Sequence, residues 1–442
     1  MKNNDTKFKI LEKLELITYI ALVLYLLDIM FLGSGDITRQ LGISTRMIFF
    51  VIALLGCIPG LLMEIKNVLK NKYCWLIVIF MIIIGVNLIR GIIVGNSRVI
   101  MITDVRGFLN YLIFFPMLYT LTNKERVLRL IKIFAHSATV VAVAAVFLSF
   151  FSTFPIGMQE KVYDFVNDYK ICGISSLNST VVRIFFHTAG RWFFVAFMFA
   201  LAFSVLEKKN KKIWIVEMSV LMVASFVSFT RSIYFGICIS VMFLVIFVLI
   251  CYKEYFKTML KNSIIMACVT VLVLFGMGIG VNGNMFHVAI QRTFLITSAT
   301  SDEEFEENFV NSDAEEQNLE IRGSREEIVW ENITKSPLIG HGLGLVNDAN
   351  GEHIEYFYHD VWSKIGIIGL IVFLLPYIVH VWDLIRKKDM YGEEQKILAL
   401  VGNSALLYLL VITYFNPCMN TTVGLSIYAL VIVLALPWKQ NC

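Results

Sequence analysis

Apolar runs about as long as a lipid bilayer is thick recur throughout this chain of 442 residues. A membrane-spanning helix needs roughly 20 such residues, because each adds about 1.5 Å across a hydrocarbon layer of about 30 Å. Only 16% of the residues are charged, against about 25% in a typical soluble protein. We therefore expect an all-α polytopic membrane protein with about 12 transmembrane helices. The runs cover Leu14–Leu32, Met47–Met63, Tyr73–Val94, Val105–Leu121, Leu128–Phe151, Ile184–Leu206, Ile213–Phe229, Ser232–Tyr252, Ser263–Val281, Val361–Ile385, Ile397–Phe415 and Val423–Trp438.

Basic residues precede the first run and then fall in every second connection. Lys and Arg in short loops are retained on the cytoplasmic side, so this alternation indicates an even number of spans with both termini in the cytoplasm. No small-residue cleavage site follows the first run, which is therefore expected to stay as a helix. Since these residues are topological anchors, we expect no nucleic-acid partner. The basic residues in question are Lys2, Lys7, Lys9 and Lys13, then Lys66, Lys70 and Lys72, then Lys124, Arg126, Arg129 and Lys132, then Lys208, Lys209, Lys211 and Lys212, then Lys253, Lys257 and Lys261, and finally Arg386, Lys387 and Lys388.

One long hydrophilic segment divides the chain into three parts. Residues 1–282 hold transmembrane helices 1–9, residues 283–358 form an extracytoplasmic loop, and residues 359–442 hold helices 10–12. The loop begins with an acidic stretch, 302–320, which is typical of a solvated face or a mobile lid. Calcium binding is the alternative, although the spacing of the carboxylates matches no EF-hand loop.

The second half of the loop has the pattern of a short helix followed by a turn. Ser324 is a candidate N-cap, Ile328, Val329 and Ile333 would face inward, and Pro337 would end the helix. Gly340, Gly342 and Gly344 then permit a close backbone turn that is neither a Walker nor a Rossmann loop. The eight cysteines show no CxxC pair, and we expect free thiols, with a bridge between Cys172 and Cys418 as the alternative.

Several arginines lie on the predicted outer side, where the orientation rule gives no reason for them. Arg231 sits in a tight turn between two apolar runs, either as a snorkelling anchor or as a ligand for an anion. Arg183, His187 and Arg191 enter the sixth span at the spacing i, i+4, i+8, so we expect them to form one cationic stripe that points into the bundle. They would either line a site or form buried ion pairs with Glu160, Asp164 or Asp168. His359, at the start of the tenth span, is either structural or part of the same site.

Three local patterns resemble the O-antigen ligase and Wzy-type polysaccharide polymerase family of bacterial envelope enzymes. They are the segment Ser228–Ser232 around Arg231, the segment Arg325–Gly342 with its Trp330 and its proline and glycines, and His359 followed by Gly366 and Gly369. The likeness covers roughly residues 213–385. The family usually has Asn after the His, where this chain has Asp360.

This resemblance implies a GT-C-like helical bundle with a large extracytoplasmic loop between helices 9 and 10. The implied activity is metal-independent displacement of a polyprenyl (undecaprenyl) pyrophosphate carrier by a sugar hydroxyl, with lipid-linked glycans as donor and acceptor and no cofactor. His359 would assist the acceptor as general base, and Asp360 would orient it or share the task. Guanidinium groups bind phosphate oxygens bidentately, and the implied pyrophosphate ligands are Arg231, Arg325, Arg322, Arg183 and Arg191, with Arg322 or Arg325 as the arginine before Trp330.

We therefore expect a glycosyltransferase of the bacterial cytoplasmic membrane that polymerises repeat units into a capsule, exopolysaccharide or O-antigen. Its active site would face the extracytoplasmic side, and its partners would include membrane lipid and other polysaccharide export and chain-length proteins. A ligase that moves finished polysaccharide to another acceptor is one alternative. A lipid-linked sugar flippase or transporter is another, although the cationic residues cluster on one side and no half-repeat is found.

Overall fold

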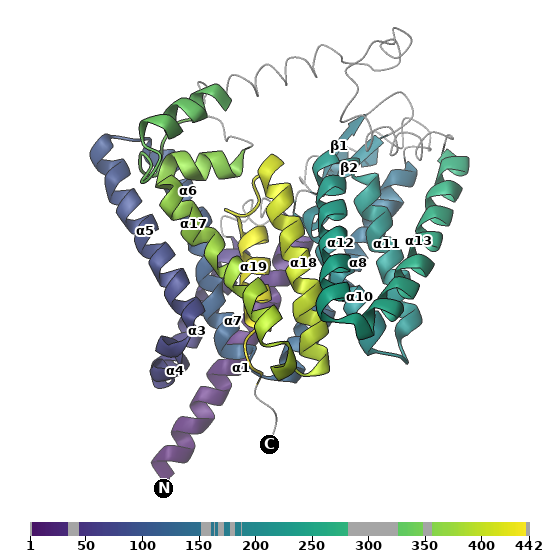
Figure 1. The fold of residues 1–442 in the computed structure, drawn as a ribbon, viewed down its shortest axis with the longest axis horizontal. Helices are drawn as coiled ribbons and strands as arrows, with labels where there is room; N and C mark the ends of the chain where they lie inside the picture. Colours follow the sequence, from purple (N-terminus) through teal and green to yellow (C-terminus); the bar gives the residue numbers. More distant parts are fainter. Residues whose placement is uncertain are drawn as a thin grey trace.

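The computed structural model describes residues 2–33, 44–151, 161–162, 164–166, 172–176, 182–186, 188–281, 326–347 and 356–438. Figure 1 shows a bundle of long helices that run between two ends. In lipid, the backbone N–H and C=O groups find no water to bond to. A helix satisfies them all within one segment. The helices are α1 (Lys2–Phe31), α3 (Thr45–Met63), α4 (Ile65–Lys70), α5 (Lys72–Val94), α6 (Arg98–Leu109), η1 (Asn110–Ile113), α7 (Phe114–Thr120), α8 (Lys124–Phe151), α10 (Ala189–Leu206), α11 (Lys211–Val227), α12 (Arg231–Cys251), α13 (Lys253–Val281), α17 (Phe357–Arg386), η2 (Lys388–Met390), α18 (Glu393–Phe415) and α19 (Thr422–Leu434).

The chain is an all-α polytopic membrane protein, apart from one small hairpin. Within the described residues, 10 helices are long and apolar enough to cross a membrane, the fourth of them formed by α6, η1 and α7 together. The predicted count of twelve is not confirmed. The two further predicted spans correspond to α11, with 17 residues, and α19, with 13, both shorter than the roughly 20 that a span needs.

Helices α10, α18 and α19 form the centre of the bundle. The apolar windows of α10 and α18 are each 83% buried, whereas those of α3, α5 and α13 are 22–28% buried. Helix α18 packs against α10, α12, α17 and α19. The peripheral α5 and α13 stand at opposite edges of Figure 1 and expose their apolar residues to the surroundings.

The basic connections lie together at one end of the bundle, as their alternation predicts. Lys72 forms an ion pair with Asp383 (2.7 Å), and Lys124 forms one with Glu394 (2.7 Å). These contacts join the start of α5 to the end of α17, and the start of α8 to that of α18. We call this the basic end. The other end, where Gly340, Gly342 and Gly344 lie, is the glycine-loop end. That the basic end faces the cytoplasm stays a prediction.

The prediction of a helix that begins at Ile184 is wrong. Residues Val182–Phe185 form strand β2, which pairs antiparallel with β1 (Gly173–Ser176), and α10 begins only at Ala189. Arg183 lies in the hairpin, in register with Ser175, while Arg191 lies in the first turn of α10. The two arginines therefore share no helix face, and no single cationic stripe is formed. His187 lies outside the described residues.

The tenth predicted span is not one uninterrupted helix. Gly366 has φ 73° and ψ 172°, a conformation that breaks α17. The segment 357–365 therefore runs in a different direction from 367–386 (Figure 1). The break separates His359 and Asp360 from the part of α17 that crosses the bundle.

Candidate functional site at the glycine-loop end

Residues 336–347 form a glycine loop wedged between α5 and α17. Residues 326–335 form the predicted short helix, which ends before Pro337 and buries Val329 and Ile333. The loop that follows needs positive φ angles at Gly340 (69°), Gly342 (90°) and Gly344 (81°), which glycine adopts at little cost. The close turn predicted from the glycine series is thus confirmed. Ser324 and the acidic stretch 302–320 lie outside the described residues.

Backbone hydrogen bonds hold this loop on both sides. The amides of His341 and Gly342 donate to the carbonyls of Ser363 and Lys364, each at 2.9 Å, and the amide of Leu343 donates to Asn87 on α5 at 3.0 Å. The side-chain amide of Asn96 donates to the carbonyls of His341, Gly342 and Leu343 at 3.0–3.3 Å. Buried polar backbone groups are thereby satisfied, and the loop is fixed against both helices.

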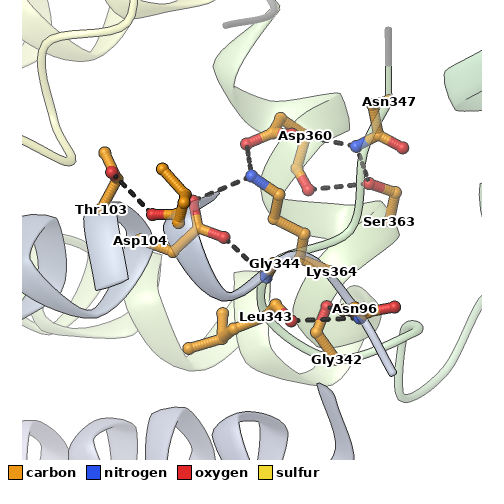
Figure 2. Close-up of polar contacts among 11 residues, drawn as sticks. Asn96, Thr103, Asp104, Gly342, Leu343, Gly344, Asn347, Asp360, Ser363 and Lys364 are labelled. Atoms are coloured by element: carbon orange, nitrogen blue, oxygen red, sulfur yellow. Dashed lines mark hydrogen bonds and ion pairs between the residues drawn. The ribbon is translucent and has the colours of Figure 1, made fainter. Parts of the chain in front are cut away.

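Beside the loop, a buried lysine lies between two carboxylates (Figure 2). Lys364 Nζ is 2.9 Å from Oδ1 of Asp104 on α6 and 2.8 Å from Oδ2 of Asp360, one turn earlier on α17. The backbone amide of Gly344 donates to Oδ2 of Asp104 at 2.9 Å, and Asn347 donates to Oδ1 of Asp360 at 2.9 Å. We call Asp104, Asp360 and Lys364 the charge cluster. It joins α6, the glycine loop and α17.

Asp360 has partners of its own in the charge cluster. Its two carboxylate oxygens accept hydrogen bonds from Lys364 and Asn347. That Asp360 orients His359 or shares its task stays a prediction. Within the part of the chain that the structure describes, Nδ1 of His359 is buried without a hydrogen-bond partner. Through its bonds to Lys364 and Asn347, Asp360 fixes the segment 357–365 that carries His359.

Aromatic rings enclose His359. The ring centroids of Trp330, Tyr356 and Tyr414 lie 5.0, 5.9 and 5.8 Å from that of His359. Trp330 comes from the short helix 326–335, and Tyr414 from the end of α18. Packed rings of this kind hold an imidazole in place, and His359 is half-buried among them.

Arg191 and Arg231 both lie beside the turn between α18 and α19. Arg191 Nη1 donates to the carbonyl of Pro417 at 3.4 Å. Asn416 donates to Oγ of Ser232 at 2.9 Å, which places the exposed Arg231, in the first turn of α12, at the same turn. Tyr414 lies just before this turn, and its ring contacts that of His359.

The other predicted phosphate ligands are not all placed. Arg322 and Arg325 lie outside the described residues, and of Arg183 only the backbone is described, in β2. Among the residues that the structure describes, no three His, Cys, Asp or Glu side chains are grouped as a metal site requires, and the seven cysteines within them are free thiols.

Two separate apolar cavities lie along α12, α17 and α18, and we call them together the apolar groove. A cavity of about 370 Å³ is lined by Phe235, Tyr358, Leu410, Val411, Tyr414 and Phe415. A second cavity, of about 520 Å³, lies further along the same three helices and includes Phe243, Trp382 and Leu407. Leu407 is one turn from Leu410 on α18, and Phe243 two turns from Phe235 on α12. One cavity thus lies beside Tyr414, and the other lies closer to the basic end along the same three helices.

Sequence reasoning missed Asp104 and Lys364. Both are ionisable residues in apolar surroundings, which is a signal for a site or an ion pair. Lys364 is also spaced i+4 from Asp360, the spacing of a helical ion pair.

No protein-family model matches the chain, and no curated protein matches it.

Proposed function

We propose that this protein is a membrane glycosyltransferase that polymerises polyprenyl-pyrophosphate-linked oligosaccharide repeat units into an envelope polysaccharide. The observation that carries the proposal is that Arg191 and Arg231 lie beside the turn between α18 and α19, next to Tyr414, whose ring contacts His359 and lines the apolar groove. Guanidinium groups suit a diphosphate, an apolar groove suits an isoprenoid chain, and an imidazole suits a sugar hydroxyl.

In the proposed reaction, the acceptor hydroxyl oxygen attacks C1 of the donor sugar. A new C1–O bond forms as the bond from C1 to the diphosphate oxygen breaks, and the polyprenyl diphosphate leaves with the electron pair. His359 accepts the hydroxyl proton through the nitrogen that faces the acceptor. Arg231 stabilises the negative charge that develops on the leaving diphosphate, with Arg191 beside the same turn. Asp360 and Lys364 act as positioning residues that fix the segment carrying His359.

The activity is tested with purified protein and a polyprenyl-pyrophosphate oligosaccharide, with the glycans resolved on a gel. A ladder of products supports a polymerase. One shifted band, formed only with a second acceptor, identifies a ligase, which needs the same leaving-group chemistry. Intact substrate after incubation contradicts both activities.

The arginine assignment is tested by Arg231→Ala, which should abolish product formation while membrane insertion stays normal. Arg129→Ala is the matched control, because Arg129 is exposed near the start of α8, at the basic end, and lines neither cavity of the groove. The control should keep wild-type activity. Equal activity of Arg231→Ala and wild type would refute the role of Arg231.

A further inference from the structure

A separate cavity lies between α3, α5 and α6. Its volume is about 380 Å³, within the usual range for ligand-binding cavities. Apolar side chains form most of its walls, including Met47, Phe50, Leu88, Ile102 and Leu109. None of its lining residues belongs to α12, α17 or α18, so it is distinct from the groove beside His359.

One cationic side chain, that of Arg106, lines this apolar cavity. Arg106 is four residues after Ile102 and three before Leu109, so the three share a face of α6. Asp104 lies about 200° away around the helix, where it bonds to Lys364 and Gly344. Within the described parts of the chain, Arg106 forms no ion pair.

Apolar side chains at the surface of α5 and α6 are exposed close to this cavity in the sequence. Val99 and Ile102, on the outer surface of α6, are 76% and 69% exposed, and Ile92 and Ile93 at the end of α5 are also exposed. In a helix long and apolar enough to span a membrane, such side chains contact lipid chains. A guanidinium group among them is costly unless it meets water, a head group or another anion.

We propose that this cavity binds a membrane lipid with a phosphate head group, whose chain occupies the apolar walls and whose phosphate binds Arg106. The planar guanidinium donates two parallel hydrogen bonds to phosphate oxygens, and its charge complements the anion. Ile102, Phe50 and Met47 contact the chain. This site does not depend on the proposed glycosyltransferase activity, because it is defined by binding and uses other helices.

The test is native mass spectrometry of the purified protein in a non-ionic detergent, titrated with dioleoylphosphatidic acid. Arg106→Ala should lose one bound lipid, with affinity for that lipid reduced about tenfold or more. Arg98→Ala is the matched control, because Arg98 is also exposed on α6, two turns earlier, and does not line the cavity. It should bind as wild type does.

Two further comparisons test the chain and the head group separately. Ile102→Trp should obstruct the cavity and weaken binding, whereas Val99→Trp, one turn earlier and outside the lining, should not. Dioleoylglycerol, which has the same chains without phosphate, and inorganic phosphate alone should each bind much more weakly than phosphatidic acid.

Wild-type binding by Arg106→Ala would overturn the site, and so would equal losses in Arg106→Ala and Arg98→Ala, which would indicate general surface charge. Equal binding of dioleoylglycerol would remove the role of the phosphate. Equal binding of inorganic phosphate would remove the role of the apolar walls. Thermal unfolding without added lipid checks that each variant is folded.

Discussion

Lys364 and Asp104 form a buried ion pair between α17 and α6 although they are 260 positions apart in the chain; Nζ and Oδ1 are separated by 2.9 Å, and both side chains are 5% exposed. Lys364→Met would leave the carboxylates of Asp104 and Asp360 buried without their cation. Removing one partner of a buried ion pair typically destabilises a protein by about 3–5 kcal/mol. We therefore expect a clear fall in the unfolding temperature of the purified protein.

Asp104→Asn is the control for this prediction. It leaves Lys364 paired with Asp360 and replaces one of two carboxylates by an amide of the same shape. Its unfolding temperature should fall less than that of Lys364→Met. If both variants unfold at the same temperature, the lysine is not the residue that holds the cluster together.

Gly342→Ala should detach the glycine loop from α5. A Cβ on Gly342 would lie 2.5 Å from the amide nitrogen of Gly91, and its φ of 90° disfavours any other residue. Gly95→Ala separates the two effects, because Gly95 has φ 84° but a Cβ there would meet no described atom within 4 Å. Gly95→Ala should lower the free energy of unfolding by about 1–2 kcal/mol, because of the left-handed backbone alone. Gly342→Ala should lower the free energy of unfolding further, which is measured as a larger fall in unfolding temperature. Equal falls in the two variants would contradict the close packing of Gly342 against Gly91.

The glycine loop also indicates what the sequence could predict. The backbone preferences of Pro337 and the three glycines depend only on the local sequence. The sequence therefore predicts both the end of the short helix and the turn that follows. The contact between Lys364 and Asp104 was not, because no local pattern specifies which residue 260 positions away completes an ion pair. The hairpin around Arg183 was missed because an apolar run next to a span looks like part of that span.

His359 provides the test of the proposed chemistry. His359→Gln keeps a polar side chain but removes the imidazole, and loss of a general base typically lowers a rate about 10²–10⁴-fold. The rate of glycan product formation by purified protein should fall by this amount, with unchanged membrane levels.

Tyr414→Phe is its control, because it keeps the ring that packs 5.8 Å from His359 and removes only the hydroxyl. The control should stay close to the wild-type rate. A fully active His359→Gln variant would mean that another group accepts the proton.

Glu207, between α10 and α11 at the basic end, should make stability depend on pH. Its carboxylate forms an ion pair with Lys132 and accepts hydrogen bonds from Trp214 Nε1 (2.9 Å) and Asn210 Nδ2 (3.3 Å). Partial burial raises the pKa of Glu207, but these bonds outweigh it, so the pKa of the carboxyl lies below its ordinary value. The folded state therefore favours the charged form more than the unfolded chain does.

Because the pKa of Glu207 is lower in the folded state, its contribution to stability is complete above the unfolded value of about 4.3 and is lost as the pH falls through the folded value. Glu207→Gln should therefore unfold at a lower temperature than wild type at pH 7, and the two should converge as the pH is lowered from about 5 toward about 3. Glu254→Gln is the control, because Glu254 is exposed in the first turn of α13 at the same end. Its unfolding temperature should follow that of wild type throughout. A Glu207→Gln difference that stays constant over this range would show that lost packing, and not the charge of the carboxylate, accounts for the change.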